Sequence, residues 1–191
     1  MINQFSKQII DLIALQTKQR IDNEQLEVYI YGLECFINTA VPVILLTIFS
    51  FLSNSVFETW LWIVTFTILR RYTGGYHAPS QLACMTSSTG LGIINTLLIQ
   101  YHTFHWSCIA LCYVIYTTLI LFLCPIESFK KKLTSLQRKQ HKCYALVIVT
   151  IISLLSLYLP TTYAITLMYS GASCLFLVII ELLHRVCCHS N

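Results

Sequence analysis

Two residues whose side chains could take part in catalysis, His77 and Cys84, lie seven positions apart in the stretch RRYTGGYHAPSQLACM, residues 70–85. Seven residues make about two turns of a helix, so a helix running through both would point the two side chains the same way. The thiolate is the reactive form of cysteine, and a helix N-terminus or a partner histidine lowers the pKa of a thiol. Histidine takes up and returns a proton near neutral pH. The spacing therefore predicts a thiol nucleophile with its base, which suits covalent catalysis at a carbonyl carbon.

The residues around this pair predict a turn that leads into a helix. Gly74 and Gly75 supply positive φ or a close backbone approach, and Pro79 is favoured at the first position of a helix. Cys84 then lies in the second turn, and the free N–H groups at the helix start can hold a developing oxyanion. If His77 lies in the turn itself, it can still fold back towards the helix start. The same spacing also arises by chance, and most cysteines in apolar segments are inert.

The elements that must position this pair are membrane helices. The chain has 191 residues, of which 56% are hydrophobic and 10% are charged, whereas soluble domains carry about 25% charged residues. Several apolar runs approach the length of about 20 residues that a helix needs to cross a bilayer. The sequence predicts an all-α, polytopic membrane protein whose six transmembrane helices lie near residues 35–53, 56–69, 82–100, 104–124, 143–159 and 163–183.

The positions of lysine and arginine orient these spans, because basic residues concentrate in cytoplasmic loops. With the amino terminus in the cytoplasm, all twelve lysine and arginine residues fall on the inner side and none falls in the three outer loops. A topology with five or seven spans would place these basic residues on both sides of the membrane. We therefore expect a cell-membrane protein with both termini in the cytoplasm. A catalytic loop at 70–85 and a basic loop at 125–142 then lie at the cytoplasmic face.

The first 34 residues differ from the six-helix domain expected at 35–191. Asp22 is expected to cap a helix that leads into the first span. The segment before it predicts an amphipathic helix that lies in the membrane interface or packs on the cytoplasmic ends of the spans. Its apolar residues recur at steps of three and four: Ile2, Phe5, Ile9, Leu12 and Ile13.

The run RRYTGGYHAPSQLAC resembles the catalytic region of the accessory gene regulator protein B (AgrB) family, which are membrane-embedded cysteine endopeptidases of Gram-positive quorum sensing. The shared pattern is an arginine pair, a G-G-Y-H block and a cysteine seven residues after the histidine. The resemblance covers the whole chain in outline, but only the G-G-Y-H…C block is specific. By this match, Cys84 is the nucleophile and His77 is the base.

The resemblance implies a two-step acyl transfer. Such an enzyme cuts a pro-peptide on its C-terminal side, retains the N-terminal part as a thioester, and releases it as a thiolactone or lactone when a peptide side chain attacks. The acidic tail of such a pro-peptide is expected to contact basic residues of the two loops, although these residues also fix topology and bind anionic lipid. The residues expected to contact substrate are Arg70, Arg71, Gly75, Ser80 and Gln81.

Other site types find less support. His102, His105, Cys108 and Cys112 step along one helical face but match no closed zinc pattern, so no metal and no cofactor is expected. There is no phosphate-binding loop and no nucleic-acid motif. The expected partners are a peptide substrate, which the resemblance implies, and the lipid bilayer, which the apolar spans imply. The number of subunits, a homodimer included, stays open.

A different function class is also open. The third span begins with polar residues, Thr86 to Thr89, and polar residues at membrane depth face protein or a water-filled cavity. A small peptide transporter or exporter would use them as a path, but it predicts such residues in several spans. A membrane partner that only presents a peptide is a third reading. Glu181 is expected to pair with Arg185 one turn later, without a catalytic role.

Overall fold

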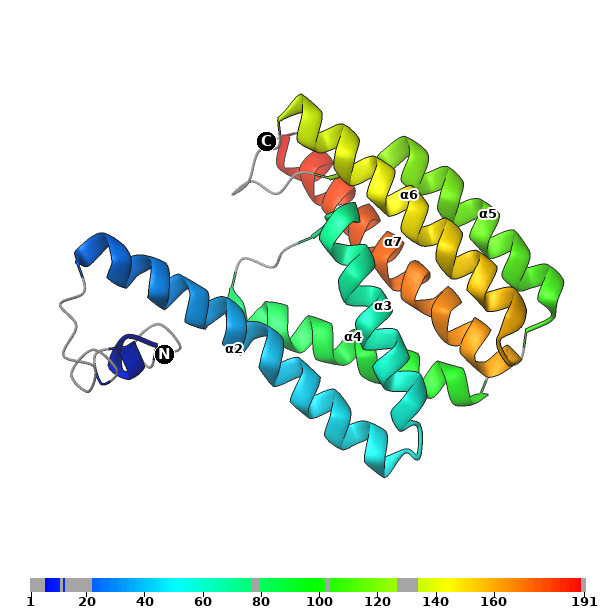
Figure 1. Cartoon of the computed structure of the whole chain (residues 1–191), viewed down its shortest axis with the longest axis horizontal. Helices are drawn as coiled ribbons and strands as arrows, with labels where there is room; N and C mark the ends of the chain where they lie inside the picture. Colours follow the sequence, from blue (N-terminus) through cyan, green and yellow to red (C-terminus); the bar gives the residue numbers. More distant parts are fainter. Residues whose placement is uncertain are drawn as a thin grey trace.

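In the computed structural model of the chain, the described residues are 6–10, 12, 22–76, 80–101, 104–126 and 134–189. They form long helices and contain no β-strand, so the predicted all-α class is confirmed (Figure 1). The helices are α2 (Asn23–Leu52), α3 (Val56–Thr73), α4 (Gln81–Tyr101), α5 (Trp106–Leu123), α6 (Ser135–Tyr158) and α7 (Thr161–His189).

Five of these helices are long and apolar enough to cross a bilayer, namely α2, α4, α5, α6 and α7. Helix α3 is the exception, because its 18 residues include Glu58 in the first turn and Arg70 and Arg71 in the last. Large apolar side chains such as Phe36 and Phe122 are exposed on the helix surfaces, as expected where lipid is the solvent. These features indicate a multi-pass membrane protein, and the sixth span stays a prediction.

The helix boundaries differ from the predicted spans at two places. Helix α2 begins at Asn23, so residues 23–34 are continuous with the first span instead of belonging to a separate segment. Helix α6 begins at Ser135, and residues 135–142 of the predicted basic loop form its first turns. Thr134 and Gln137 cap this helix reciprocally, each side chain accepting a hydrogen bond from the other residue's backbone N–H. The lysine and arginine residues there are good helix formers, although their charge resembles that of a loop.

The N-terminal amphipathic helix stays a prediction. Before Asp22, only residues 6–10 and 12 are described, and these are helical. Within them Ile10 is buried and Leu12 is exposed. The apolar residues Ile2, Phe5 and Ile13 lie outside the described residues.

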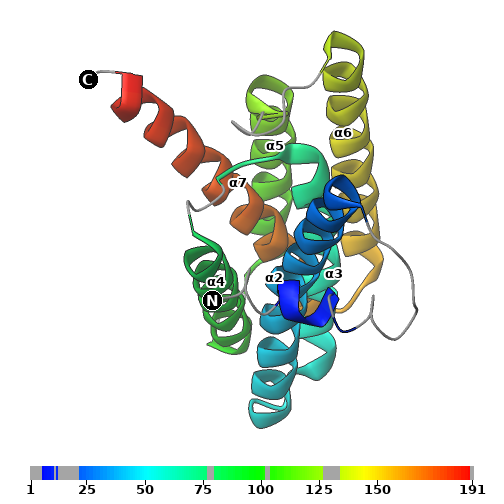
Figure 2. The same ribbon diagram turned by 90° about the vertical axis from the view of Figure 1, so that its left-hand side faces the viewer.

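Helix α7 lies at the centre of the bundle. Figures 1 and 2 show α5 and α6 on one side of it and α2 with α4 on the other, and α3 packs along it. The main core joins α3, α5, α6 and α7 through Leu69, Ile120, Val149 and Val178. A smaller apolar cluster of Leu46, Trp62 and Ile63 joins α2 to α3. The candidate site lies beside this second cluster.

Polar side chains fix α4 against its neighbours. Asn95 donates a hydrogen bond to Ser173 Oγ on α7 at 3.0 Å, and the hydroxyls of Thr59 and Thr96 join α3 to α4 at 3.2 Å. Both pairs satisfy polar groups inside an apolar bundle. They hold the helix that carries Cys84 in place along its length.

Candidate active site

The turn after α3 requires its two glycines. Gly74 has a φ of +74° and Gly75 a φ of +118°, a region that side chains with a Cβ rarely adopt. A Cβ at Gly74 would also collide with the carbonyl oxygen of Ile126, and one at Gly75 would collide with the guanidinium of Arg70. The structure thus confirms both uses predicted for the double glycine, positive φ and close approach.

Hydrogen bonds hold this turn from several elements. The Tyr76 N–H donates to the Leu177 carbonyl of α7 at 3.0 Å, and the Ile126 N–H donates to the Thr73 carbonyl at 3.1 Å. Arg70 folds back from the last turn of α3. Its Nη1 donates to the Gly74 carbonyl at 2.8 Å, and its Nη2 donates to the Tyr76 carbonyl. The backbone of residues 74–76, which precedes His77, is therefore held both by α7 and by Arg70 of α3.

Helix α4 begins at a side-chain cap. Ser80 Oγ accepts the N–H of Ala83 at 3.1 Å, and the Ser80 carbonyl accepts the N–H of Cys84 at 3.0 Å. Such a cap satisfies N–H groups that a helix start leaves free. Gln81 then donates to Glu34 Oε2 at 2.8 Å, which ties the start of α4 to α2. Cys84 lies one turn into the helix, close to the predicted position.

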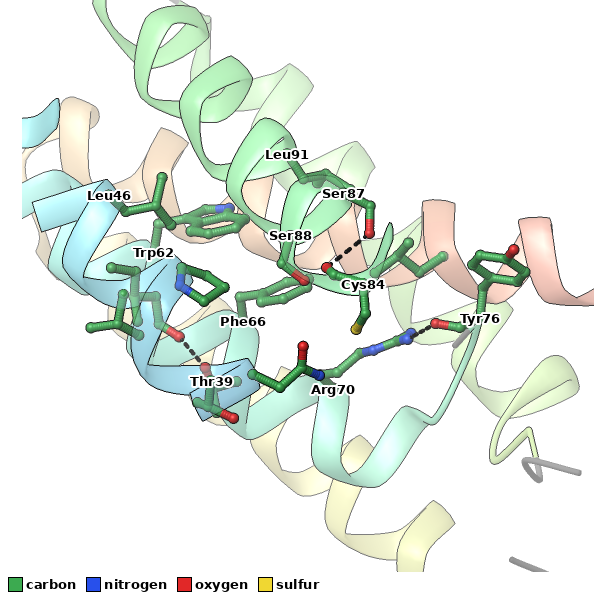
Figure 3. Close-up of a pocket in the computed structure, with 16 residues that line it drawn as sticks. Thr39, Leu46, Trp62, Phe66, Arg70, Tyr76, Cys84, Ser87, Ser88 and Leu91 are labelled. Atoms are coloured by element: carbon green, nitrogen blue, oxygen red, sulfur yellow. Dashed lines mark hydrogen bonds between the residues drawn. The ribbon is translucent and has the colours of Figure 1, made fainter. Parts of the chain in front are cut away.

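A cavity of about 230 Å³ lies where α2, α3 and α4 meet, and Cys84 borders it. Figure 3 shows the Cys84 sulfur pointing towards the side chain of Arg70, with Tyr76 beyond. Ser87 and Ser88 line the same end. The other end is apolar and includes Leu46 and Trp62 (Figure 3). A nucleophile thus lies at the polar end of a largely apolar space.

The predicted site residues have different environments. Cys84 is half-buried, Arg70 lines the cavity, and Arg71 is exposed. Gly75 is buried in the turn, whereas Ser80 caps α4 and Gln81 binds Glu34. His77 lies outside the described residues, so its distance from Cys84 stays a prediction. Its neighbour Tyr76 lines the cavity.

Helix α7 supports the site in a way that the sequence pattern did not predict. Glu181 is only 5% exposed and accepts a hydrogen bond from Arg185 Nε at 3.0 Å, which confirms the predicted pair. The ring of His184 lies 5.8 Å from that of Tyr76. The sequence did offer one signal, which is Glu181 itself, because a carboxylate within an apolar helix usually has a polar neighbour.

The other described cysteines lie elsewhere. Cys124 and Cys174 are buried in the main core, Cys112 packs partly buried against it, and Cys35, Cys108, Cys143 and Cys187 are exposed. Of the described cysteines, Cys84 is the one that borders the cavity. Its position one turn after a capped helix start, beside a glycine turn that immediately precedes a histidine in sequence, matches the pattern that led to the resemblance.

A family model described as accessory gene regulator B matches residues 6–183, which is most of the chain. The chain belongs to the accessory gene regulator B family. The resemblance drawn from the G-G-Y-H…C block is therefore confirmed.

Several AgrB relatives align with the chain. A putative AgrB-like protein of Clostridium perfringens (strain SM101 / Type A) is 34% identical over 101 residues, covering 53% of this chain and 44% of the relative. Accessory gene regulator protein B of Staphylococcus aureus (strain MW2) is 23% identical over 149 residues, covering 78% and 80%. That of Staphylococcus haemolyticus (strain JCSC1435) is 23% identical over 155 residues, covering 79% and 80%. The match thus spans less than half the length of the Clostridium relative, and no solved structure matches the chain.

Proposed function

We propose that this chain is a membrane-embedded cysteine endopeptidase that processes a signal pro-peptide for quorum sensing. The observation that carries the proposal is the position of Cys84, half-buried at the edge of a cavity and one turn into a capped helix. Family membership supports the same reading, because the G-G-Y-H…C block lies inside the matched residues.

In the first step, His77 takes the proton from Cys84 Sγ, and the thiolate attacks the carbonyl carbon of the scissile peptide bond. The C–N bond breaks as His77 gives the proton to the departing amine. The C-terminal part of the pro-peptide leaves, and the N-terminal part stays on Cys84 as a thioester.

In the second step, a cysteine thiol or serine hydroxyl of the retained peptide attacks the thioester carbon. A new thioester or ester bond closes the ring, the bond to Cys84 breaks, and the proton of the attacking group returns to the Cys84 sulfur by way of His77. The products are a thiolactone or lactone peptide and the free enzyme.

A membrane enzyme suits this reaction because a thioester is also open to hydrolysis. The apolar part of the cavity disfavours water beside the acyl group. Ring closure is intramolecular, and well-oriented intramolecular attack lowers a barrier by roughly 7–11 kcal/mol in model systems. The internal nucleophile thus has the advantage over water.

The proposed topology has six spans, α3 included, with both termini and the site at the cytoplasmic face. An interfacial N-terminal helix precedes them. Arg71 and the basic residues near the start of α6 hold the acidic tail of the pro-peptide. Arg70 is less suited to that task, because its terminal nitrogens already bind the turn carbonyls.

The exporter reading has weaker support. Thr86 and Ser87 donate their hydroxyl hydrogens to carbonyls of their own helix. Such bonds satisfy these side chains without a water-filled path. The polar start of α4 therefore does not require a transport route.

The test of the proposal is the cleavage of a tagged pro-peptide encoded beside the gene. Cys84→Ala and His77→Ala should each lower the cleavage rate at least about a thousandfold, because removing one residue of a catalytic unit abolishes most of the rate enhancement of the whole unit. Membrane insertion should stay normal, since neither residue defines a span. If the Cys84→Ala protein releases the peptide tail at the normal rate, the proposed mechanism is wrong.

A further inference from the structure

A hydrogen bond between two side chains joins α2 to the first residue of α4. Gln81 Nε2 donates to Glu34 Oε2 at 2.8 Å, and both residues are half-buried. Hydrogen bonds to an ionised carboxylate are roughly twice as strong as those between neutral groups. Neither residue is among the described residues that line the cavity, and neither has a part in the reaction steps proposed above.

The two halves of α4 are packed differently. Its buried residues all lie in the second half: Gly92, Asn95, Thr96 and Ile99. There α4 contacts α2 closely, since a Cβ at Gly92 would come within 2.5 Å of the Leu46 side chain. In the first half, residues 81–91, no residue is buried, and Cys84 borders the cavity. Packing therefore constrains the second half, and the half that carries Cys84 has few buried contacts to hold it.

We propose that Glu34 and Gln81 are positioning residues for Cys84. Gln81 lies in the first turn of α4, three residues before Cys84, and its bond to Glu34 connects this turn to α2. The Ser80 cap acts only within α4, because Ser80 Oγ accepts from the N–H of Ala83. The link between helices thus holds the Cys84 sulfur in register with the groups that α2 and α3 contribute to the cavity.

The position of a nucleophile matters because a displacement of about 1 Å can cost about a hundredfold in rate. This inference rests on the proposed function, to which it adds two residues that act through Cys84.

A direct contact between Gln81 and the substrate is the alternative. The amide nitrogen of Gln81 already donates to Glu34, and its side chain lies outside the cavity lining. The two roles differ in their kinetics. Loss of a substrate contact raises KM, whereas a misplaced nucleophile lowers kcat.

The experiment exchanges the two side chains in the full chain, in lipid nanodiscs. Gln81→Glu places a second carboxylate opposite Glu34, and the two like charges repel. The kcat of pro-peptide cleavage should fall at least about tenfold, as expected for the loss of a hydrogen bond to a charged group, and KM should stay within about twofold.

The exchanged pair should restore the rate. In the double variant Glu34→Gln with Gln81→Glu, α2 carries the donor and α4 the acceptor, so kcat should return to within about threefold of the unaltered chain. Glu34→Gln alone keeps an oxygen that accepts from Gln81, and its kcat should also stay within about threefold.

The matched control is Gln100→Glu, near the other end of the same helix. Gln100 Nε2 donates to the Ser53 carbonyl at 2.7 Å. The variant removes the same kind of donor and adds the same charge far from Cys84, so kcat should be unchanged. Rates are normalised to the amount of inserted, monodisperse protein. A merely structural role for the pair would lower that amount and leave kcat per molecule as it was.

Amide hydrogen exchange tests the link without any reaction. Peptides from residues 81–91 should exchange at least about threefold faster in Gln81→Glu than in the unaltered chain, because the first half of α4 opens more often. The double variant should restore normal exchange, and residues 92–101 should be unaffected in both.

The inference requires faster exchange and a lower kcat together in Gln81→Glu, so either change alone, or neither, would overturn it. A raised KM with a normal kcat would assign Gln81 to the substrate instead. A double variant no more active than Gln81→Glu would also contradict a positioning pair. If the unaltered chain cleaves no pro-peptide, the proposed function fails while hydrogen exchange still tests the link, so the two ideas can fail separately.

Discussion

At the scale of single residues, Cys84 owes its proposed reactivity to its place in the fold. Nine cysteines are present, and composition alone does not separate them. The seven-residue spacing from His77 singled out Cys84, and the structure adds the cavity that it borders. Cys124 and Cys174, in contrast, are buried among core side chains, where a thiol acts as a small hydrophobe. The orientation of His77 stays a prediction, because His77 lies outside the described residues.

The two neighbouring arginines have different environments that the sequence does not distinguish. Arg70 binds two carbonyls of the turn through its planar fork, and Arg71 is exposed. Lysine keeps the charge but lacks this fork. Arg70→Lys should therefore lower the initial rate of pro-peptide cleavage about tenfold or more, measured in membranes and normalised to protein level by immunoblotting.

Arg71→Lys is the control, and it should keep most of the rate because an exposed cation needs only its charge. Full activity in Arg70→Lys would contradict the positioning role. It would instead favour a role for Arg70 as a simple charge that holds the acidic tail.

At the scale of elements, the turn between α3 and α4 combines predictable and unpredictable features. Its glycines follow from local chemistry, and the structure bears them out. Helix α4 begins at Gln81 with Ser80 as its cap, two residues after the predicted start at Pro79, which lies outside the described residues. The contacts of Tyr76 with Leu177 and His184 on α7 did not follow, because contacts across a hundred residues leave no local pattern. The first turns of α6 were missed for a related reason, since charge favours both solvent-facing helices and loops.

The turn supplies a stability test. Gly75→Ala forces a Cβ into a φ of +118° and against Arg70, a strain of order 1–3 kcal/mol. The midpoint of thermal unfolding in detergent should fall, and cleavage should fall with it. Gly90→Ala is the matched control, because a Cβ at Gly90 meets nothing within 4 Å and alanine favours a helix over glycine. Its midpoint should stay level or rise; equal losses in both variants would refute the explanation.

At the scale of the whole molecule, hydropathy was sufficient to locate a helix for every predicted span. The length and low charge of a helix can be read from its own sequence, whatever it packs against. Five helices are therefore candidate spans by length and composition alone. Helix α3 does not, because its terminal charges are the groups that shape the site at one end. The orientation in the membrane rests on the one-sided distribution of basic residues.

That orientation is testable with single cysteines introduced into an otherwise cysteine-free chain. A membrane-impermeant maleimide applied to intact cells should label Asn54→Cys, between α2 and α3, and Thr162→Cys, in the first turn of α7; both positions are exposed and lie on the proposed outer side. Arg71→Cys and Arg138→Cys should be labelled only after the cells are permeabilised. Labelling of Arg71→Cys in intact cells would place the site on the wrong side of the membrane.

The central claim is that Cys84 carries the peptide as a thioester, and an acyl-enzyme trap tests it most directly. A pro-peptide whose ring-forming cysteine or serine is replaced by alanine cannot cyclise, so the intermediate should accumulate. After an acid quench, mass spectrometry should find the N-terminal part of the peptide on Cys84, released by hydroxylamine. Cleavage without any adduct, or an adduct on another cysteine, would contradict the account.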